Sequence, residues 1–207
     1  MADRKMKTIK AAYLQARHWQ IFIVFAGIII LSQVITLPLV VASTLNDANS
    51  TTLGLAFGAV MAVGTASLVG WFASIGTFTN TLIKAPLRPK TGFFRFALIY
   101  PILYMFVAGP FFLGRNPSMI GVILPLHFFA VFCLFYDLHF ASKNFVLART
   151  GKRVTFYDYA GPFFLMWFFP IGVWSVQPKI NQLYAERSRL VPGASEGGGD
   201  PPEAHVS

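Results

Sequence analysis

Residues 53–78 read LGLAFGAVMAVGTASLVGWFASIGTF and contain no charged side chain. At ~1.5 Å per residue, this run of about 26 residues makes a helix of roughly 39 Å, long enough to cross a bilayer with some tilt. Every fourth residue is small: Gly54, Gly58, Ala62, Ala66, Gly70 and Ser74. Residues four apart share a helix face, and helices in lipid associate through small residues because apolar burial gains little there. We therefore expect a helix-packing surface, with the general abundance of Gly and Ala in membrane helices as the alternative explanation.

The composition of the chain indicates a membrane protein. Hydrophobic residues make up 55% of it and charged residues 12%, whereas a soluble domain carries about 25% charged residues. The net charge is +9 at pH 7. The basic residues cluster beside the apolar runs, which favours contact with the bilayer and with anionic lipid at the cytoplasmic face over nucleic-acid binding. The single cysteine, Cys133, excludes a disulfide within the chain.

The apolar runs predict an all-α membrane protein, a bundle of four transmembrane helices plus a broken fifth hydrophobic segment. The expected spans cover about residues 20–42, 53–78, 93–113 and 119–140, and the fifth segment covers about residues 160–176. Residues 1–18 are expected to form a basic amphipathic lead-in to the bundle of residues 19–181. Residues 182–207 are expected to form a disordered cytoplasmic tail.

The fifth segment is either a re-entrant or interfacial hairpin or a fifth full span. It is short for a span, at about 17 residues, and Pro170 and Gly172 predict a helix break near its centre. Lys and Arg precede the first span and follow the second and fourth spans, which places the N-terminus in the cytoplasm. A hairpin keeps Lys179, Arg187 and Arg189 on that same side, so we prefer the hairpin.

Four polar residues in the fourth predicted span are candidates for a ligand or ion pathway: His127, Tyr136, Asp137 and His139. An ionised carboxylate inside a membrane helix is costly unless it is paired or near the surface. Asp137 is therefore expected either to pair with Arg95, Lys143 or a tyrosine, or to serve a pathway. His127 has the ordinary alternative of a hydrogen bond to a carbonyl group. The spacing of His, Cys and acidic residues matches no metal or haem motif, so we expect neither a metal nor a cofactor.

The C-terminal part of the chain carries a recognisable pattern. It consists of Thr155-Phe156, Asp158, the run WFFPIGVW at residues 167–174, Gln177-Pro178 and Asn181. This pattern resembles the closing segment of a group of uncharacterised small bacterial multi-span membrane proteins. The resemblance implies a bacterial inner (cytoplasmic) membrane protein of shared architecture and implies no activity.

The sequence does not identify a function. No serine-hydrolase, phosphate-binding or zinc-protease motif is present in it, which argues against an enzyme. We expect an accessory or structural membrane protein that acts by helix–helix contact, with itself as a homo-oligomer or with a membrane protein partner. The alternative is a small transporter or channel-like carrier that uses Asp137, His127 and the Pro170–Gly172 break. An enzyme acting on lipid or quinone is the least favoured reading.

Overall fold

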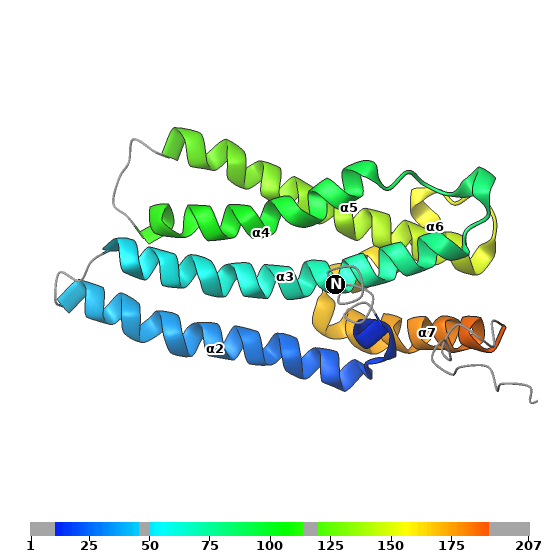
Figure 1. Cartoon of the computed structure of the whole chain (residues 1–207), viewed down its shortest axis with the longest axis horizontal. Helices are drawn as coiled ribbons and strands as arrows, with labels where there is room; N and C mark the ends of the chain where they lie inside the picture. The colour runs from blue at the N-terminus through cyan, green and yellow to red at the C-terminus, as the bar shows by residue number, and fades with distance from the viewer. Residues whose placement is uncertain (1–10, 46–49, 114–119, 191–207) are drawn as a thin grey trace, which may run out of the picture.

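The computed structural model describes residues 11–45, 50–113 and 120–190, and these residues contain helices and no strand. The all-helical prediction is confirmed (Figure 1). The helices are α2 (His18–Leu45), α3 (Ser50–Leu82), α4 (Gly92–Leu113), α5 (Ile120–Thr150), α6 (Phe156–Trp167) and α7 (Phe169–Leu190), with a 3-10 turn, η1 (Ala85–Leu87), between α3 and α4. A short helical turn at residues 11–15 precedes α2.

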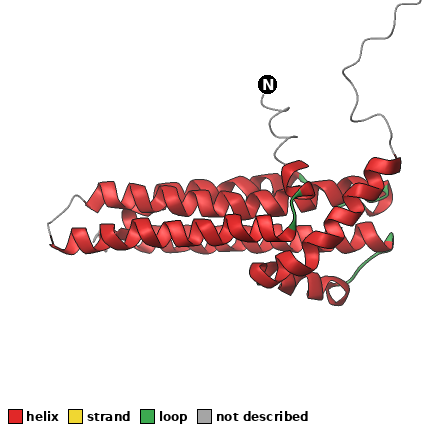
Figure 2. Ribbon diagram, turned by 90° about the horizontal axis from the view of Figure 1, so that it is seen from below, coloured by secondary structure: helices red, strands yellow, loops and turns green. Residues whose placement is uncertain are grey.

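Helices α2 to α5 form an extended bundle (Figure 2), and α3 is central in its contacts. Helix α3 packs against α2, α4 and α5, and α4 also packs against α5. The small residues of α3 lie inside this arrangement: Gly54, Gly58, Ala62 and Ser74 are buried, and Ala66 and Gly70 are half-buried. The small-residue face therefore belongs to contacts within one chain.

Three helical stretches are long and apolar enough to cross a membrane: His18–Pro38, Gly54–Leu82 and Ile120–Thr150. Helix α4 contributes a shorter apolar stretch, Gly92–Ala108. Their outward surfaces are also apolar, since side chains such as Ile30, Leu37 and Phe128 are more than 60% exposed. An apolar surface on so many sides of a helical bundle suits lipid better than water.

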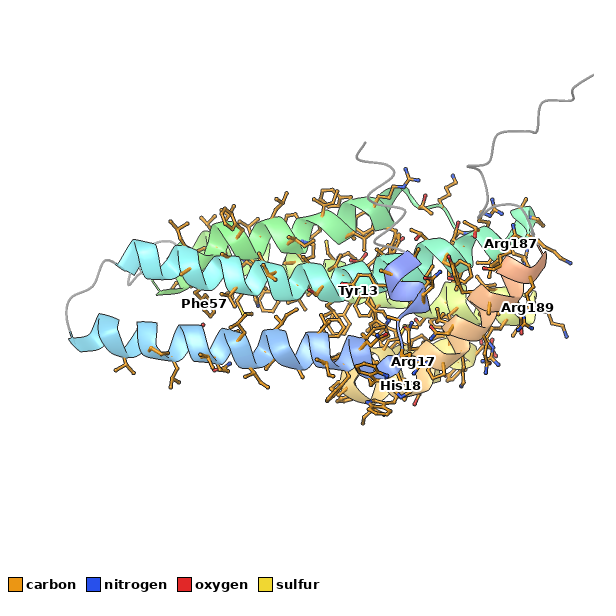
Figure 3. The ribbon with its side chains drawn as sticks, turned by 60° about the horizontal axis from the view of Figure 1, so that its bottom comes forward. Tyr13, Arg17, His18, Phe57, Arg187 and Arg189 are labelled. Carbon is orange, nitrogen blue, oxygen red and sulfur yellow. The ribbon has the colours of Figure 1, made fainter. Side chains whose placement is uncertain are left out.

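The described cationic side chains gather at one end of the bundle, which we call the basic end. They belong to the start of α2, the α3–α4 connection, the first turn of α4, the last third of α5 and the segments that follow it: Arg17, Lys84, Arg88, Lys90, Arg95, Lys143, Arg149, Lys152, Arg153, Lys179, Arg187 and Arg189. Figure 3 shows Arg187 and Arg189 at the end opposite Phe57, and Arg17 in the same half of the molecule. The acidic residues in the described ranges are Asp137, Asp158 and Glu186.

Helices α6 and α7 form a hairpin at the basic end, and the break lies at Phe168 rather than at Pro170–Gly172. Phe168 has a non-helical backbone (φ −81°, ψ 63°). Pro170 is the second residue of α7, where its missing N–H removes no helical hydrogen bond, so the helix restarts just before it. A Cβ on Gly172 would overlap the Leu165 carbonyl oxygen. The turn is therefore so tight that α7 needs a glycine where it passes α6.

Two helices at the C-terminal side extend beyond the predicted ranges. Helix α5 continues to Thr150, and α7 continues to Leu190, so residues 182–190 are helical and not part of a disordered tail. These extensions contain good helix formers and pack on the bundle: the ring of Tyr184 lies 5.4 Å from that of Phe78 in α3. The predicted lead-in before residue 11, both connections at the other end of the bundle (residues 46–49 and 114–119) and the tail after residue 190 lie outside the described residues.

Candidate functional site

A buried polar network joins the N-terminal turn, α3 and α7 at the basic end. We call it the polar junction, and it consists of Tyr13, Ser67, Trp71, Gln177 and Asn181. Gln177 is at its centre and is completely buried. Its Oε1 accepts a hydrogen bond from Nε1 of Trp71 at 3.0 Å, and its Nε2 donates to the Tyr13 carbonyl at 2.7 Å. One side chain thus ties together three segments that are far apart in the sequence.

The polar junction satisfies backbone groups where the chain bends between residue 15 and α2. The last carbonyls of a helical turn have no partner within it. Gln177 Nε2 donates to the Ala16 carbonyl at 3.2 Å, and Asn181 Nδ2 donates to the same oxygen at 3.1 Å. On the other side of the bend, the Arg17 N–H donates to Oε1 of Gln20 at 2.8 Å. Both halves of the bend are therefore capped, the first half by α7.

Tyr13 attaches the N-terminal turn to α3. Its hydroxyl donates to the Ser67 carbonyl at 3.3 Å, and its ring lies 3.3 Å from the position that a Cβ on Gly70 would occupy. Burial raises the pKa of the Tyr13 hydroxyl above its ordinary value. Figure 3 shows Tyr13 against α3. The half-buried Gly70 of the small-residue face thus contacts this tyrosine ring.

The start of the hairpin has its own polar cap. Oδ2 of Asp158 accepts hydrogen bonds from the Thr155 N–H at 2.6 Å and from the Thr155 hydroxyl at 2.9 Å. The hydrogen bond from the Thr155 backbone, followed by that from its side chain, lowers the pKa of the Asp158 carboxyl group. A Thr-x-x-Asp spacing before an apolar run is a known helix-start signal. In the sequence, Thr155, Asp158, Gln177 and Asn181 entered only as part of a resemblance. Their roles in capping α6 and in the polar junction were not predicted.

Asp137 is completely buried, and the expected pairing with Arg95, Lys143 or a tyrosine is not formed. Neither carboxyl oxygen has a hydrogen-bond partner among the described residues. Asn144 is likewise completely buried, and neither its amide nitrogen nor its amide oxygen has a described hydrogen-bond partner. Residues seven apart lie on the same helix face. The seven-residue spacing of Asp137 and Asn144 is visible in the sequence, but Asn144 was not among the predicted site residues.

The face of α5 that carries these two residues points into the bundle. Its members are all completely buried: Ala130, Cys133, Asp137, Ala141 and Asn144. One turn after Asp137, the ring of Phe140 stacks on Phe94 of α4 at 4.0 Å. Both rings lie over Gly76 of α3, whose absent Cβ would come within 3.2 Å of each. The interior face of α5 therefore meets α3 and α4 in close contact at this level.

The other predicted site residues do not converge on Asp137. Nδ1 of His139 lies 3.3 Å from the Tyr159 hydroxyl of α6, and the ring of Tyr136 makes an edge contact with Phe93 of α4 at 4.7 Å. His127 is near Tyr104, with 5.6 Å between ring centroids, and ten residues from Asp137, roughly 15 Å along α5. Among the described residues, no group of three or more His, Cys, Asp or Glu side chains could hold a metal ion.

Comparison with known proteins assigns no family. No family model, curated protein or solved structure matches this chain. The observations that bear on function are therefore the apolar surface with its basic end, the polar junction and the buried pair Asp137 and Asn144.

Proposed function

We propose that the chain is an integral protein of the bacterial inner membrane, with its N-terminus in the cytoplasm. Helices α2 to α5 are the four spans, and α6 and α7 are a hairpin that enters from the cytoplasmic face and returns to it. The observation that carries this proposal is the separation of charge from apolar surface: the described parts of α2 and α3 contain no charged residue, and the described cations gather at the basic end. Cytoplasmic loops carry an excess of Lys and Arg.

Cysteine labelling tests this topology. In a Cys133→Ala background, we expect Ser188→Cys and Thr150→Cys to react with a membrane-impermeant maleimide only after the cytoplasmic face is opened. Asn116→Cys, in the predicted outer connection, is the matched control and is expected to react in intact cells. Labelling of Ser188→Cys from outside would show that the fifth segment crosses the membrane, and the proposed hairpin would be wrong.

We propose an accessory or structural role, exerted by helix contact with a second copy or with another membrane protein, and with anionic lipid at the basic end. Helix α2 supports this role because its main contacts are with α3 and α7, and Ile30, Val34 and Leu37 are exposed. The small residues of α3 do not offer a surface for a partner, because they pack inside the chain. A Leu at Gly58 or Ala62 would therefore test the fold and not the partner contact.

Cross-linking in native membranes tests this role. We expect Val34→Cys, in the Cys133→Ala background, to form a specific cross-linked species through the outer face of α2. Ile99→Cys, on the similarly exposed surface of α4, is the matched control and should give none. Equal cross-linking at both positions, or at neither, would contradict a partner surface on α2.

A small carrier is the second candidate, and the observation that favours it is the buried, unpartnered Asp137. Ionisable side chains inside membrane bundles often mark proton or ion routes. The structure places His127 far from Asp137, so the supporting geometry is confined to Asp137 and Asn144.

A further inference from the structure

We propose that Asp137 is a proton-binding site that exchanges its proton with the basic end by way of Asn144. This inference rests on the carrier reading above and names its ligand class and its direction of access. Two polar side chains on one helix face are completely buried, and neither has a described hydrogen-bond partner. Burial of such groups lowers the stability of the fold, and ionisable groups of this kind in membrane helices are often functional.

The surroundings of Asp137 favour a proton over a metal cation. Calcium and magnesium need at least about six oxygen ligands around the ion, and Asp137 supplies two oxygens beside Ala141 and Cys133, which are completely buried. Ala97 of α4 is also completely buried and lies one turn after Phe94, at the level of Asp137. These small neighbours provide no other charged ligand.

The titratable and charged groups around Asp137 are few. On α5 they are Cys133, Tyr136, His139 and Lys143, of which His139 lies two residues and Lys143 six residues away, and on α4 the nearest is the exposed Arg95. Helix α3 contributes none, because residues 54–82 contain no acidic, basic, His, Cys or Tyr side chain. On α6, Tyr159 contacts His139 rather than Asp137. The proton of Asp137 is therefore governed mainly by access to water.

Access from the basic end follows from the register of the helices. Asn144 lies roughly 10 Å nearer the basic end than Asp137 along α5. Phe140 packs over Gly76, so Asn80 of α3, four residues later, lies at the level of Asn144. Asn80 Nδ2 donates to the Pro89 carbonyl in the α3–α4 connection at 3.1 Å. Asn80 and Asn144 therefore lie at one level between that connection and the interior, without a hydrogen bond between them, and we call this pair the polar step.

The stacked rings of Phe94 and Phe140 lie between this step and Asp137. They form an apolar seal, so exchange of the proton is expected to be slow and to require a local opening of the bundle. On the opposite side of Asp137, toward the other end, α5 presents the buried Ala130 against Tyr104 and Ala108 of α4.

Infrared spectroscopy of the full-length protein in lipid tests this inference. A neutral carboxyl group has a carbonyl stretching band that a carboxylate lacks. We expect this band at neutral pH in the wild type and its loss in Asp137→Asn, while a spectrum of Asp158→Asn still contains it. Absence of the band from folded wild-type protein would overturn the proposal.

Transfer to deuterated water tests the route, because the band shifts when the carboxyl proton exchanges. We expect Asn144→Leu to slow this shift by roughly tenfold or more, since an apolar side chain replaces the polar step. His127→Leu, toward the other end of α5, is the matched control and should leave the rate unchanged. A slower shift in His127→Leu alone would reverse the proposed direction of access.

Proton uptake by liposomes that contain the protein separates this inference from the carrier function. Uptake that is lost in Asp137→Asn would support both. A second outcome is that the carboxyl band is present and its exchange rate depends on Asn144, but the liposomes take up no protons. This outcome would support the proton site and exclude the carrier function.

Discussion

Gly172→Ala is expected to destabilise the folded protein by at least about 3 kcal/mol, above the usual range for overpacking of a core position. The new methyl group would overlap the Leu165 carbonyl oxygen, which belongs to the backbone of α6 and cannot move aside as a side chain can. The two helices would have to separate at Phe168. Denaturation of the purified protein in mixed detergent micelles, followed by circular dichroism, measures this loss.

Gly161→Ala is the matched control for Gly172→Ala. Gly161 lies in α6 of the same hairpin, and no atom lies within 4 Å of the position that its Cβ would take. Alanine is a better helix former than glycine by up to about 1 kcal/mol, so this variant should be as stable as the wild type or slightly more stable. If Gly172→Ala were as stable as Gly161→Ala, α7 would not lie as close to the Leu165 carbonyl as described here.

The helical class and the approximate positions of the long helices were predictable because apolar runs of this length are typical of long helices. The predicted span of residues 93–113 differs by one residue from α4, which ends where the apolar run ends. The prediction failed where helices leave the apolar region. The last turns of α5 are rich in polar residues, yet Phe145 and Leu147 are buried there. Hydropathy alone could not distinguish such a packed amphipathic end from a loop.

A helix break in the fifth segment was predicted, but it lies at Phe168, before the predicted position at Pro170–Gly172. Pro170 and Gly172 lie close to the break, but both residues are inside the first turns of α7, and the chain turns before them at Phe168. Proline is tolerated in the first turn of a helix, so it indicates a helix start as readily as a helix end. Only the position of Leu165 relative to Gly172 explains why glycine is required, and that contact depends on tertiary structure.

The polar groups were the least predictable part of the chain. Asp137 was recognised as unusual, but its lack of a partner depends on how α3 and α4 pack against α5. The contact of Gln177 with Tyr13 spans 164 positions of the sequence, and no local pattern encodes it. A buried glutamine in an apolar run shows that a partner is needed, because an unsatisfied amide is costly, but it does not show which partner.

Gln177→Leu is expected to cost on the order of 3–5 kcal/mol, because it leaves several buried polar groups without a partner at about 1–3 kcal/mol each. The groups affected are Nε1 of Trp71, the Tyr13 carbonyl and Oδ1 of Asn181, while the Ala16 carbonyl keeps its bond from Asn181. The N-terminal turn should also detach from α7. Trypsin cleavage after Arg17, at the bend, should therefore become faster at temperatures where the helical bundle is still folded.

Gln182→Leu makes the same chemical change five residues later in α7, at an exposed position. A surface substitution of this kind usually changes stability by less than about 0.5 kcal/mol, so it separates the loss of the polar junction from a general effect of leucine on α7. Trp71→Phe removes the donor to Gln177 together with part of the volume of a buried ring, so it also lowers stability. Tryptic cleavage after Arg17 should nevertheless change little, because the bonds from Gln177 to the carbonyls of residues 13 and 16 remain. If Gln177→Leu and Gln182→Leu were cleaved at the same rate, the polar junction would not be what holds the N-terminal turn against α7.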